Sequence, residues 1–537
     1  MRHLSVRSPV DPTTRRPPAS GTEVEASFSR PRLALAILSL VLFLSFLDNT
    51  IVSVALADVQ SRLHAGISAL QWVVGGYALA FAALMLVFGT LGDLFGRRRI
   101  MGIGVTVFCA GSLLAAVAPT VGVLIAGRVV MGVGAAASEP GTLSMIRHIF
   151  PDRQDRAQAL GVWAAVSGLA LALGPLIGGV LVAVWSFRAV FVFNLAFGAV
   201  ALAGLYAVLP ENADPLDRRL DMRGFALGAA AITAATFATI QGETTGYSSA
   251  VVVALYIVAV VALAGFVVDQ RRADNPVLDL RYFRHPAFAA SNIIAFTAYF
   301  ATFALFFFVP LYVVEVGGLS GYRVAAVFAP LAVAMIAASA LTGRWVARSG
   351  PRIPMTVGCL LAGTGILLTD VRLTPNPGVA DIGWTLAIAG IGLGIVFVPI
   401  TSVVLSVVPG RRSGMAASAT NTSRELGALA GVSVLGAIVN GQLTVNLTHR
   451  LIQLHIPAAI RTLVIVGVTT GQTAKNIPGS AAINSLVNQV EHPAYAAFRT
   501  GLDISLLLAA SLLLACAPIA LTTIRARRRV RADNATA

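Results

Sequence analysis

The chain has 537 residues, of which 57% are hydrophobic and 12% are charged. A soluble globular protein carries about 25% charged residues, so this composition excludes a soluble domain and predicts an all-α integral membrane protein. The net charge of +15 does not indicate a nucleic-acid partner, because the arginines lie in clusters between apolar runs, as they do in the cytoplasmic loops of membrane proteins.

Apolar runs of roughly 20 residues, the length that crosses a bilayer as a helix, occur about fourteen times. They lie at 33–56, 70–91, 100–118, 121–144, 158–183, 189–209, 224–241, 250–268, 288–312, 323–342, 354–370, 382–408, 414–440 and 502–524. An even number of spans places both termini on one side of the membrane. Most of the 39 basic residues then fall on that side, so the positive-inside rule predicts that both termini are cytoplasmic.

The segments outside these spans have their own character. Residues 1–32 are rich in Pro, Arg and Ser and predict a disordered cytoplasmic tail, while 525–537 form a basic cytoplasmic tail. We expect 441–500 to be a long external loop. Within it, 456–470 are apolar but short and contain Arg461, so we interpret them as an interfacial segment, with a helical hairpin as the alternative.

The chain contains an internal repeat. GTLGDLFGRR at 89–98 aligns without gaps on GRWVARSGPR at 343–352, and each copy follows the second span of a set of six. We therefore expect two related six-helix halves, 33–209 and 288–524, separated by a region 210–287 that holds an inserted helix pair. In membrane proteins built from such repeats, the substrate site lies between the repeats near the membrane midplane.

Three short segments resemble signature motifs of the major facilitator superfamily. They are GTLGDLFGRRR (Gly89–Arg99), RVVMGVGAA (Arg128–Ala136) and GLALALGPLIGG (Gly168–Gly179), and the third resembles the motif of the antiporters in that family. FLDNTIVSVALA in the first span resembles the fourteen-helix drug:proton antiporter branch, although its usual closing proline is Ala57 here. The resemblance covers essentially everything after residue 32 and implies a major facilitator fold that works by alternating access.

The loop after the span 70–91 carries three glycines and an acid before a run of arginines. The resemblance implies that Asp93, Arg97 and Arg98 form a gating latch that holds the cytoplasmic side shut. Its expected receiver is the start of the span 414–440, after Arg411 and Arg412, because a helix N-terminus favours an anion by about 0.3–1 kcal/mol. An ordinary positively charged loop is the alternative. The glycines, which permit a tight turn and close helix approach, are Gly89, Gly92 and Gly96.

Two opposite charges lie deep inside apolar spans. A charge near the bilayer centre costs at least about 2.5–3.5 kcal/mol, so Arg128 must face a partner or a wet cavity. The resemblance implies that Arg128 couples protons, although the glutamine usual three residues later is Met131. At about 1.5 Å per residue, Asp48 and Arg128 lie at similar depths, ~12 and ~10 Å below the external ends of their spans. We expect them to interact, either as a structural ion pair or with Asp48 as the proton-titrating group.

A second acid follows in the same span as Arg128. The spacing between Arg128 and Glu139 turns a regular helix to within about 20° of the same face, so if Arg128 faces the cavity, Glu139 faces it too, deeper toward the cytoplasm. Glu139 is then a second proton site or a contact for a cationic substrate. The alternative is an interfacial acid beside the helix breaker Pro140.

The span 158–183 carries little side-chain bulk along its antiporter-like motif. Pro175 removes a backbone donor and kinks the helix, while small residues let neighbouring backbones touch. A simple helix-packing face is one interpretation, and the resemblance implies a seal against uncoupled leakage. The residues of this antiporter motif are Gly168, Gly174, Pro175, Gly178 and Gly179.

Adjacent charges interrupt the span 414–440. Arg424 and Glu425 lie about 100° apart on the helix, so they cannot both face one partner. We assign them a structural or gating role, with proton coupling as the alternative. Further candidates for the cavity wall are Asn49, Trp72, Tyr77, Tyr299 and Asn421.

Other classes of function lack their motifs. We find no P-loop, HExxH or GxSxG sequence, and we assign the three cysteines no disulfide or metal role, so we expect neither an enzyme nor a cofactor. The sequence predicts a proton-coupled antiporter in a bacterial cytoplasmic membrane. It would act as a monomer and export amphipathic or lipophilic, cationic small molecules such as drugs, antibiotics, dyes or a self-made metabolite. A nutrient or lipid transporter of the same fold and a non-transporting membrane receptor are the alternatives.

Overall fold

The computed structural model describes residues 30–212, 221–273, 276, 278–374, 377–408, 413–453, 461 and 481–524. For 481–494 and a few other positions, Asp93 among them, only the backbone is described. The described part is almost wholly helical and contains 14 helices long and apolar enough to cross a membrane, as the sequence predicts. The predicted tails, apart from the residues from Arg30 onward, and the segment 456–470, apart from Arg461, lie outside the described residues.

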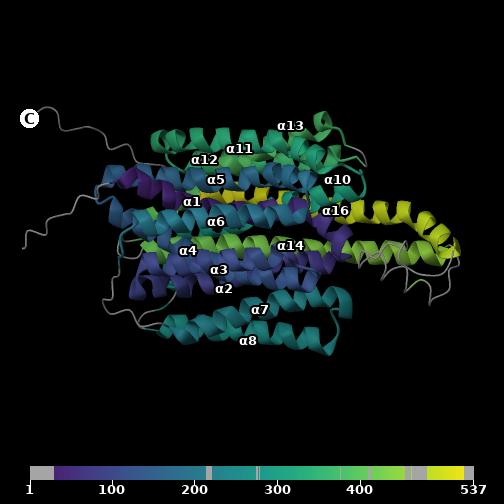
Figure 1. The fold of residues 1–537 in the computed structure, drawn as a ribbon, viewed down its shortest axis with the longest axis horizontal. Coiled ribbons are helices and arrows are strands. Elements are labelled where there is room, and N and C mark those ends of the chain that lie inside the picture. The colour runs from purple at the N-terminus through teal and green to yellow at the C-terminus, as the bar shows by residue number, and fades with distance from the viewer. Residues whose placement is uncertain are drawn as a thin grey trace, which may run out of the picture.

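The N-terminal half is a bundle of six helices that run alternately up and down (Figure 1). Pro31, rather than residue 33, begins the first helix, because proline suits the first helical turn. The six helices are α1 (Pro31–Leu63), α2 (Ile67–Phe95), α3 (Arg97–Ala116), α4 (Val121–Ile149), α5 (Arg153–Val184) and α6 (Phe187–Val208).

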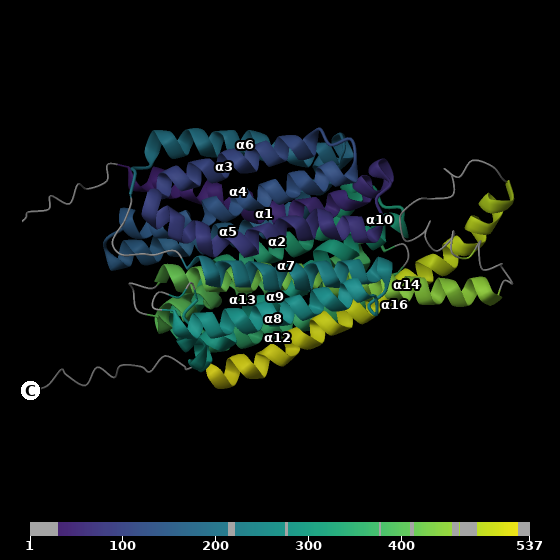
Figure 2. The same cartoon turned by 90° about the horizontal axis from the view of Figure 1, so that it is seen from below.

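The C-terminal half also has six membrane spans. Its first span is α9 (Pro286–Phe303), a π-helical turn η2 (Ala304–Phe308) and α10 (Val309–Glu315) in succession. The remaining five are α11 (Gly321–Ser349), α12 (Arg352–Arg372), α13 (Val379–Val407), α14 (Ser413–Gln453) and α16 (Ala481–Thr523). We call the end of the bundle where α1 begins and α16 finishes the terminal end, and the opposite end the distal end (Figure 2).

The two halves meet along a seam made of two antiparallel helix pairs, α2 with α14 and α5 with α11. Each pair joins the second helix of one half to the fifth helix of the other half. Two related halves that face each other across a two-fold axis would produce this reciprocal pairing of second and fifth helices. Small residues line the seam: a Cβ placed on Gly179 would lie 2.7 Å from the carbonyl oxygen of Gly321, for example.

The two copies of the sequence repeat have matching backbones. α2 ends at Phe95 and α11 ends at Ser349, and in each case the next residue is a glycine in a left-handed conformation, Gly96 with φ 103° and Gly350 with φ 79°. Only glycine adopts such angles without steric cost. The structure thereby explains why glycine recurs at these aligned positions.

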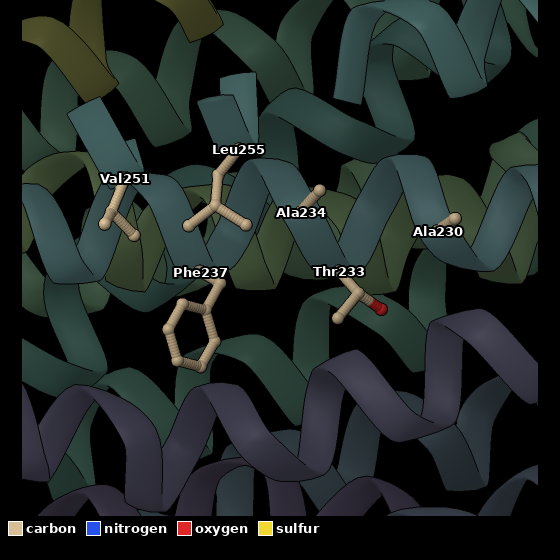
Figure 3. A pocket seen from close by; sticks show the side chains of 6 residues that line it. All are labelled: Ala230, Thr233, Ala234, Phe237, Val251 and Leu255. Carbon is tan, nitrogen blue, oxygen red and sulfur yellow. The ribbon is translucent and has the colours of Figure 1, made fainter. Parts of the chain in front are cut away.

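The inserted pair, α7 (Met222–Thr245) and α8 (Ala250–Arg272), lies outside the two halves. α7 packs against both α2 and α14 and so covers one side of the seam, while α8 packs chiefly on α7 and forms the outer edge (Figures 1 and 2). A short 3-10 turn, η1 (Leu280–Arg284), leads to α9. An apolar hollow of about 410 Å³ lies on this pair (Figure 3). It is lined by Ala230, Thr233, Ala234, Phe237, Val251 and Leu255.

The expected loop 441–500 is wrong at both ends, because α14 continues to Gln453 and α16 begins at Ala481. Leu443, Leu447 and Leu451 are buried, with at most 3% exposure. Leucines four residues apart form an apolar stripe along one face of a helix. This stripe keeps α14 helical beyond its continuous apolar run, where the average composition is polar enough to suggest a loop.

Candidate functional site

Asp48 and Arg128 form an ion pair inside the N-terminal half. A carboxylate oxygen of Asp48 on α1 contacts Nη1 of Arg128 on α4, and both side chains are 0% exposed. The pairing that similar depth predicts is therefore present. A buried pair of this kind is sensitive to change, because removal of one partner leaves the other charge uncompensated in an apolar medium.

Further groups from α2 and α6 hold the pair. Asn194 on α6 donates from Nδ2 to the other oxygen of Asp48 at 2.7 Å. Nε of Arg128 donates to the carbonyl oxygen of Val73 at 2.9 Å, and its guanidinium lies 4.4 Å from the centre of the Tyr77 ring. Sequence reasoning missed Asn194, although a lone amide in the apolar run FVFNLAFG was a usable signal.

Asn49, next to Asp48 on α1, turns toward the other half. Its Nδ2 donates to Oε1 of Glu425 on α14 at 3.3 Å. Because adjacent residues lie about 100° apart on a helix, one turn of α1 carries both the buried ion pair and a contact across to the C-terminal half. Asn49 thus links the two halves.

Glu139 on α4 makes a second contact between the halves. Its Oε1 accepts from Nδ2 of Asn421 at 2.7 Å, and Oδ1 of Asn421 accepts from Arg424 at 3.1 Å. Arg424 also donates to the hydroxyl of Thr401 on α13 at 3.1 Å and lies 5.9 Å from the centre of the Tyr299 ring. Arg424 and Glu425 have different partners, as their angular separation requires.

Arg128 and Glu139 leave nearly the same face of α4 but reach different partners. The hydrogen-bond and ion-pair partners of Arg128 lie within the N-terminal half, whereas Glu139 contacts the other half. Helical spacing fixes the direction in which a side chain leaves the backbone. The long arginine side chain then turns sideways between α1 and α2, where a carboxylate and a carbonyl compensate its charge.

Among the described side chains, the buried charges around these contacts do not balance. Three carboxylates, from Asp48, Glu139 and Glu425, stand against two guanidinium groups, from Arg128 and Arg424, and each of the five side chains is at most 4% exposed. Oε2 of Glu139 and Oε2 of Glu425 have no hydrogen-bond partner among the described residues. An unpaired charge in an apolar interior is costly, so a proton or a cation would stabilise this arrangement.

The antiporter motif wedges α5 between α1 and α11. A Cβ on Gly174 would lie 1.9 Å from Oγ1 of Thr50, and one on Gly178 would lie 2.6 Å from the carbonyl oxygen of Ile51. Gly168 and Gly179 face α11 instead, where an added Cβ would meet Ser339 at 3.3 Å and the Gly321 carbonyl at 2.7 Å. Gly174, Gly178 and Gly179 thus permit backbone contact on two sides of one helix, whereas Gly168 approaches only the Ser339 side chain.

Pro175 sits in the same motif and lacks the N–H that would bond to the Leu171 carbonyl one turn earlier. Thr50 of α1 supplies the missing donor, since its hydroxyl donates to the Leu171 oxygen at 3.0 Å. The proline of α5 and the contact of α5 with α1 are therefore linked.

The first turn of α3, directly after the α2–α3 turn, contacts the end of the N-terminal half. The backbone N–H of Arg98 donates to Glu211 at 3.1 Å, and Nη1 of Arg98 donates to the Leu209 carbonyl at 3.0 Å. The N–H of Arg97 donates to the Asn212 carbonyl at 2.9 Å. The side chain of Asp93, and Arg411 and Arg412 at its expected receiver, lie outside the described residues.

The latch glycines differ in how closely their neighbours approach. A Cβ on Gly96 would lie 2.6 Å from the Glu211 carboxylate, and one on Gly89 would make an ordinary 3.5 Å contact with Pro140. A Cβ on Gly92 would meet only the Arg97 side chain at 4.0 Å. The expectation that a neighbouring helix approaches closely at Gly92 is therefore wrong. Trp72 lies apart from the site and contacts Phe237 of α7, with ring centres 5.2 Å apart.

The family of the chain follows from a comparison with known sequences. The sequence profile of the Major Facilitator Superfamily matches residues 38–432, which run from α1 into α14. The chain belongs to the major facilitator superfamily. As a member of this superfamily it is a multi-pass membrane transporter of small molecules and not an enzyme.

Three relatives within the superfamily have names that concern drugs. The multidrug resistance protein Stp of Mycobacterium tuberculosis is 33% identical over 435 residues, which are 80% of this chain and 81% of Stp. The methylenomycin A resistance protein of Bacillus subtilis is 32% identical over 78% of this chain and 90% of its own length. The tetracenomycin C resistance and export protein of Streptomyces glaucescens is 29% identical over 96% of this chain and 95% of its own length.

A solved major facilitator structure has the same architecture. It is the crystal structure of a bacterial homolog of the human lysosomal transporter Spinster, in an inward-facing and occupied conformation. Its TM-score is 0.61 at 16% identity, over 91% of this chain and 96% of that chain. At this identity the likeness supports the fold alone.

Proposed function

We propose that the chain is a proton-coupled antiporter that exports amphipathic or lipophilic, cationic small molecules across the bacterial cytoplasmic membrane by alternating access. The similarity to proteins named for drug resistance and export supports the substrate class. We assign the terminal end to the cytoplasm, because the arginine run Arg97–Arg99 at the start of α3 lies there. We take the working unit to be one chain.

The observation that carries the proposal is the adjacency of Asp48 and Asn49 on α1. When Asp48 is charged, it attracts Arg128 and accepts from Asn194. A proton on Asp48 removes the ionic attraction and leaves the guanidinium to its remaining partners. The resulting shift of α1 acts directly on Asn49 and its bond to Glu425 across the halves. Proton binding and the contact between the halves are thus linked within one helical turn.

The excess of negative charge between the halves, which comes from carboxylates, supports a cationic substrate. Glu139 and Glu425 each have one oxygen without a partner among the described residues, and the lone Arg424 neutralises only one of these two charges. A bound cation compensates the remaining charge while the halves enclose it. Protons that bind to the same carboxylates compete with the cation and favour its release on the acidic side.

The energies required are modest. A gradient of one pH unit supplies about 1.4 kcal/mol per proton, which is a factor of about ten in concentration. For exchange of one proton against one monovalent cation, such a gradient accumulates the cation about tenfold. Asp48→Asn retains the size of the side chain but carries no titrating proton, so coupling is lost while substrate binding is retained.

Transport of ethidium in proteoliposomes tests the proposal. With the interior acidic by one pH unit and the membrane potential clamped, the wild-type protein should accumulate ethidium about tenfold, and Asp48→Asn should reach a ratio of about one. Asp48→Glu should retain part of the activity with a shifted pH profile. Asp155→Asn, which alters an exposed acid in the first turn of α5, is the control and should behave as wild type. Accumulation by Asp48→Asn with unchanged pH dependence would refute the role of Asp48 and make Glu139 the next residue to test.

A further inference from the structure

The inserted helix pair contacts both halves through one acidic residue near the distal end. Glu243 lies in the last turn of α7, two positions before the helix ends at Thr245. Its Oε1 accepts from Nε2 of Gln71 on α2 at 3.0 Å, and its Oε2 accepts from Nδ2 of Asn440 on α14 at 3.0 Å. α2 belongs to the N-terminal half and α14 to the C-terminal half, so one carboxylate bridges the seam.

Gln71 is itself held within the seam. It is 0% exposed, and its Nε2 also donates to the carbonyl oxygen of Val432 on α14 at 3.3 Å. Gly436 makes room for it, because a Cβ there would lie 1.5 Å from Nε2 of Gln71. The amide therefore passes across the α2–α14 contact to reach Glu243.

The amides are oriented by the carboxylate. Oε1 of Gln71 and Oδ1 of Asn440 are buried and have no donor among the described residues, whereas both amide nitrogens point to Glu243. In the described part of the chain no cationic side chain forms an ion pair with Glu243. Hydrogen bonds to a charged acceptor are stronger than those between neutral groups, so these two bonds dominate the local arrangement.

We propose that Glu243, Gln71 and Asn440 form a clasp that holds the distal end of the seam shut and makes the inserted pair part of the gate. The proposal rests on alternating access as proposed above. Opening of the distal end moves α2 and α14 apart, and a single carboxylate on α7 cannot follow both helices. At least one of its two bonds must break in the distal-open state, so the clasp favours the closed state and Glu243 acts as a positioning residue.

Spin-label distances across the seam test the clasp without substrate or a proton gradient. Labels are attached at Ser68→Cys on α2 and Val445→Cys on α14, near the distal end, in a protein without Cys109, Cys359 and Cys516. In proteoliposomes the wild-type background should give a mainly short distance with a minor long one. Glu243→Gln, which keeps the shape and removes the charge, should raise the ratio of long to short distances by about tenfold.

Two further variants make the test specific. Thr245→Val alters an exposed hydroxyl in the same last turn of α7 and should leave the distances unchanged. Glu243→Gln combined with Asn440→Asp exchanges the carboxylate and the amide across the second of the two bonds and should restore the short distance. If Glu243→Gln acted only by disturbing the packing of α7, this exchange would not restore the short distance.

The outcomes separate the clasp from the transport cycle. If wild-type and Glu243→Gln distances agree, or if Thr245→Val changes them equally, the clasp is refuted while alternating access stands. If the wild-type protein gives one distance under every condition, including an imposed pH gradient, both proposals fail. If the exchange variant does not recover the short distance, Glu243 acts through the packing of α7 and the clasp is refuted.

Discussion

Thr50 shows how a single hydroxyl can support a neighbouring helix that contains a proline. Pro175 removes the donor for the Leu171 carbonyl, and the Thr50 hydroxyl from α1 replaces it. An unpaired buried carbonyl costs free energy because no water reaches it. The antiporter motif therefore depends on a residue of another helix that its own sequence does not reveal.

Thr50→Val should lower the free energy of unfolding by about 1–3 kcal/mol, since valine keeps the shape and leaves the Leu171 oxygen without a donor. Thr302→Val is a matched control. Thr302 is equally buried, but its hydroxyl donates to the Ala298 carbonyl within its own helix. Thermal unfolding in detergent followed by circular dichroism would check the difference. Equal melting temperatures for the two variants would contradict this account.

Some side-chain contacts of the candidate site could be predicted from the sequence. Depth along each helix predicted that Asp48 meets Arg128, and adjacency predicted that Arg424 and Glu425 have different partners. Asn194 and Glu243 were missed, because their partners are 146 and 172 positions away in the chain. Which helices become neighbours is a property of packing, and one sequence does not state it.

Among the elements, α5 carries the strongest steric constraints. Gly174 and Gly178 lie against α1, and Gly168 and Gly179 lie against α11, so bulk added at these glycines presses α5 against one of its two neighbours. Backbone atoms rather than flexible side chains form the contact at Gly178, so they cannot move aside cheaply.

Gly178→Ala should reduce stability and make proteoliposomes leak protons without substrate, because the Cβ forces α5 away from Ile51. Gly161→Ala, in the same helix, meets nothing within 4 Å and should be tolerated or stabilise α5 by up to about 1 kcal/mol. Dissipation of an imposed pH gradient measures the leak. The sealing role of the motif would be disproved by equal leak rates in the two variants.

Sequence periodicity predicted the helices better than their ends. Runs of apolar residues found the fourteen spans because the bilayer demands that length. The extension of α14 to Gln453 was missed because it depends on the spacing of Leu443, Leu447 and Leu451, which a mean hydropathy over the segment does not register.

At the scale of the whole molecule, the seam has the symmetry of the repeat. The pairs α2–α14 and α5–α11 are equivalent under exchange of the halves, but only the first is covered by the inserted pair. The two helix pairs of the seam are therefore unequal, because among the described residues α7 packs against α2 and α14 but not against the pair α5–α11.

Our orientation places the terminal end in the cytoplasm, and cysteine labelling checks it. Ser61→Cys lies exposed near the distal end, and Asp155→Cys lies exposed near the terminal end. A membrane-impermeant maleimide should label Ser61→Cys in intact cells and Asp155→Cys only in everted vesicles. The native cysteines are replaced beforehand, and the reverse pattern would invert the topology.

The length of α14 has a practical consequence. Its 41 residues extend about 60 Å, whereas the hydrocarbon core of a bilayer is about 30 Å thick. α14 and the first part of α16 therefore rise beyond the other helices at the distal end (Figure 2). A transporter of this size is usually hard to align in electron micrographs because the lipid or detergent hides its outline. An antibody fragment raised against this paired projection would give each particle a visible handle.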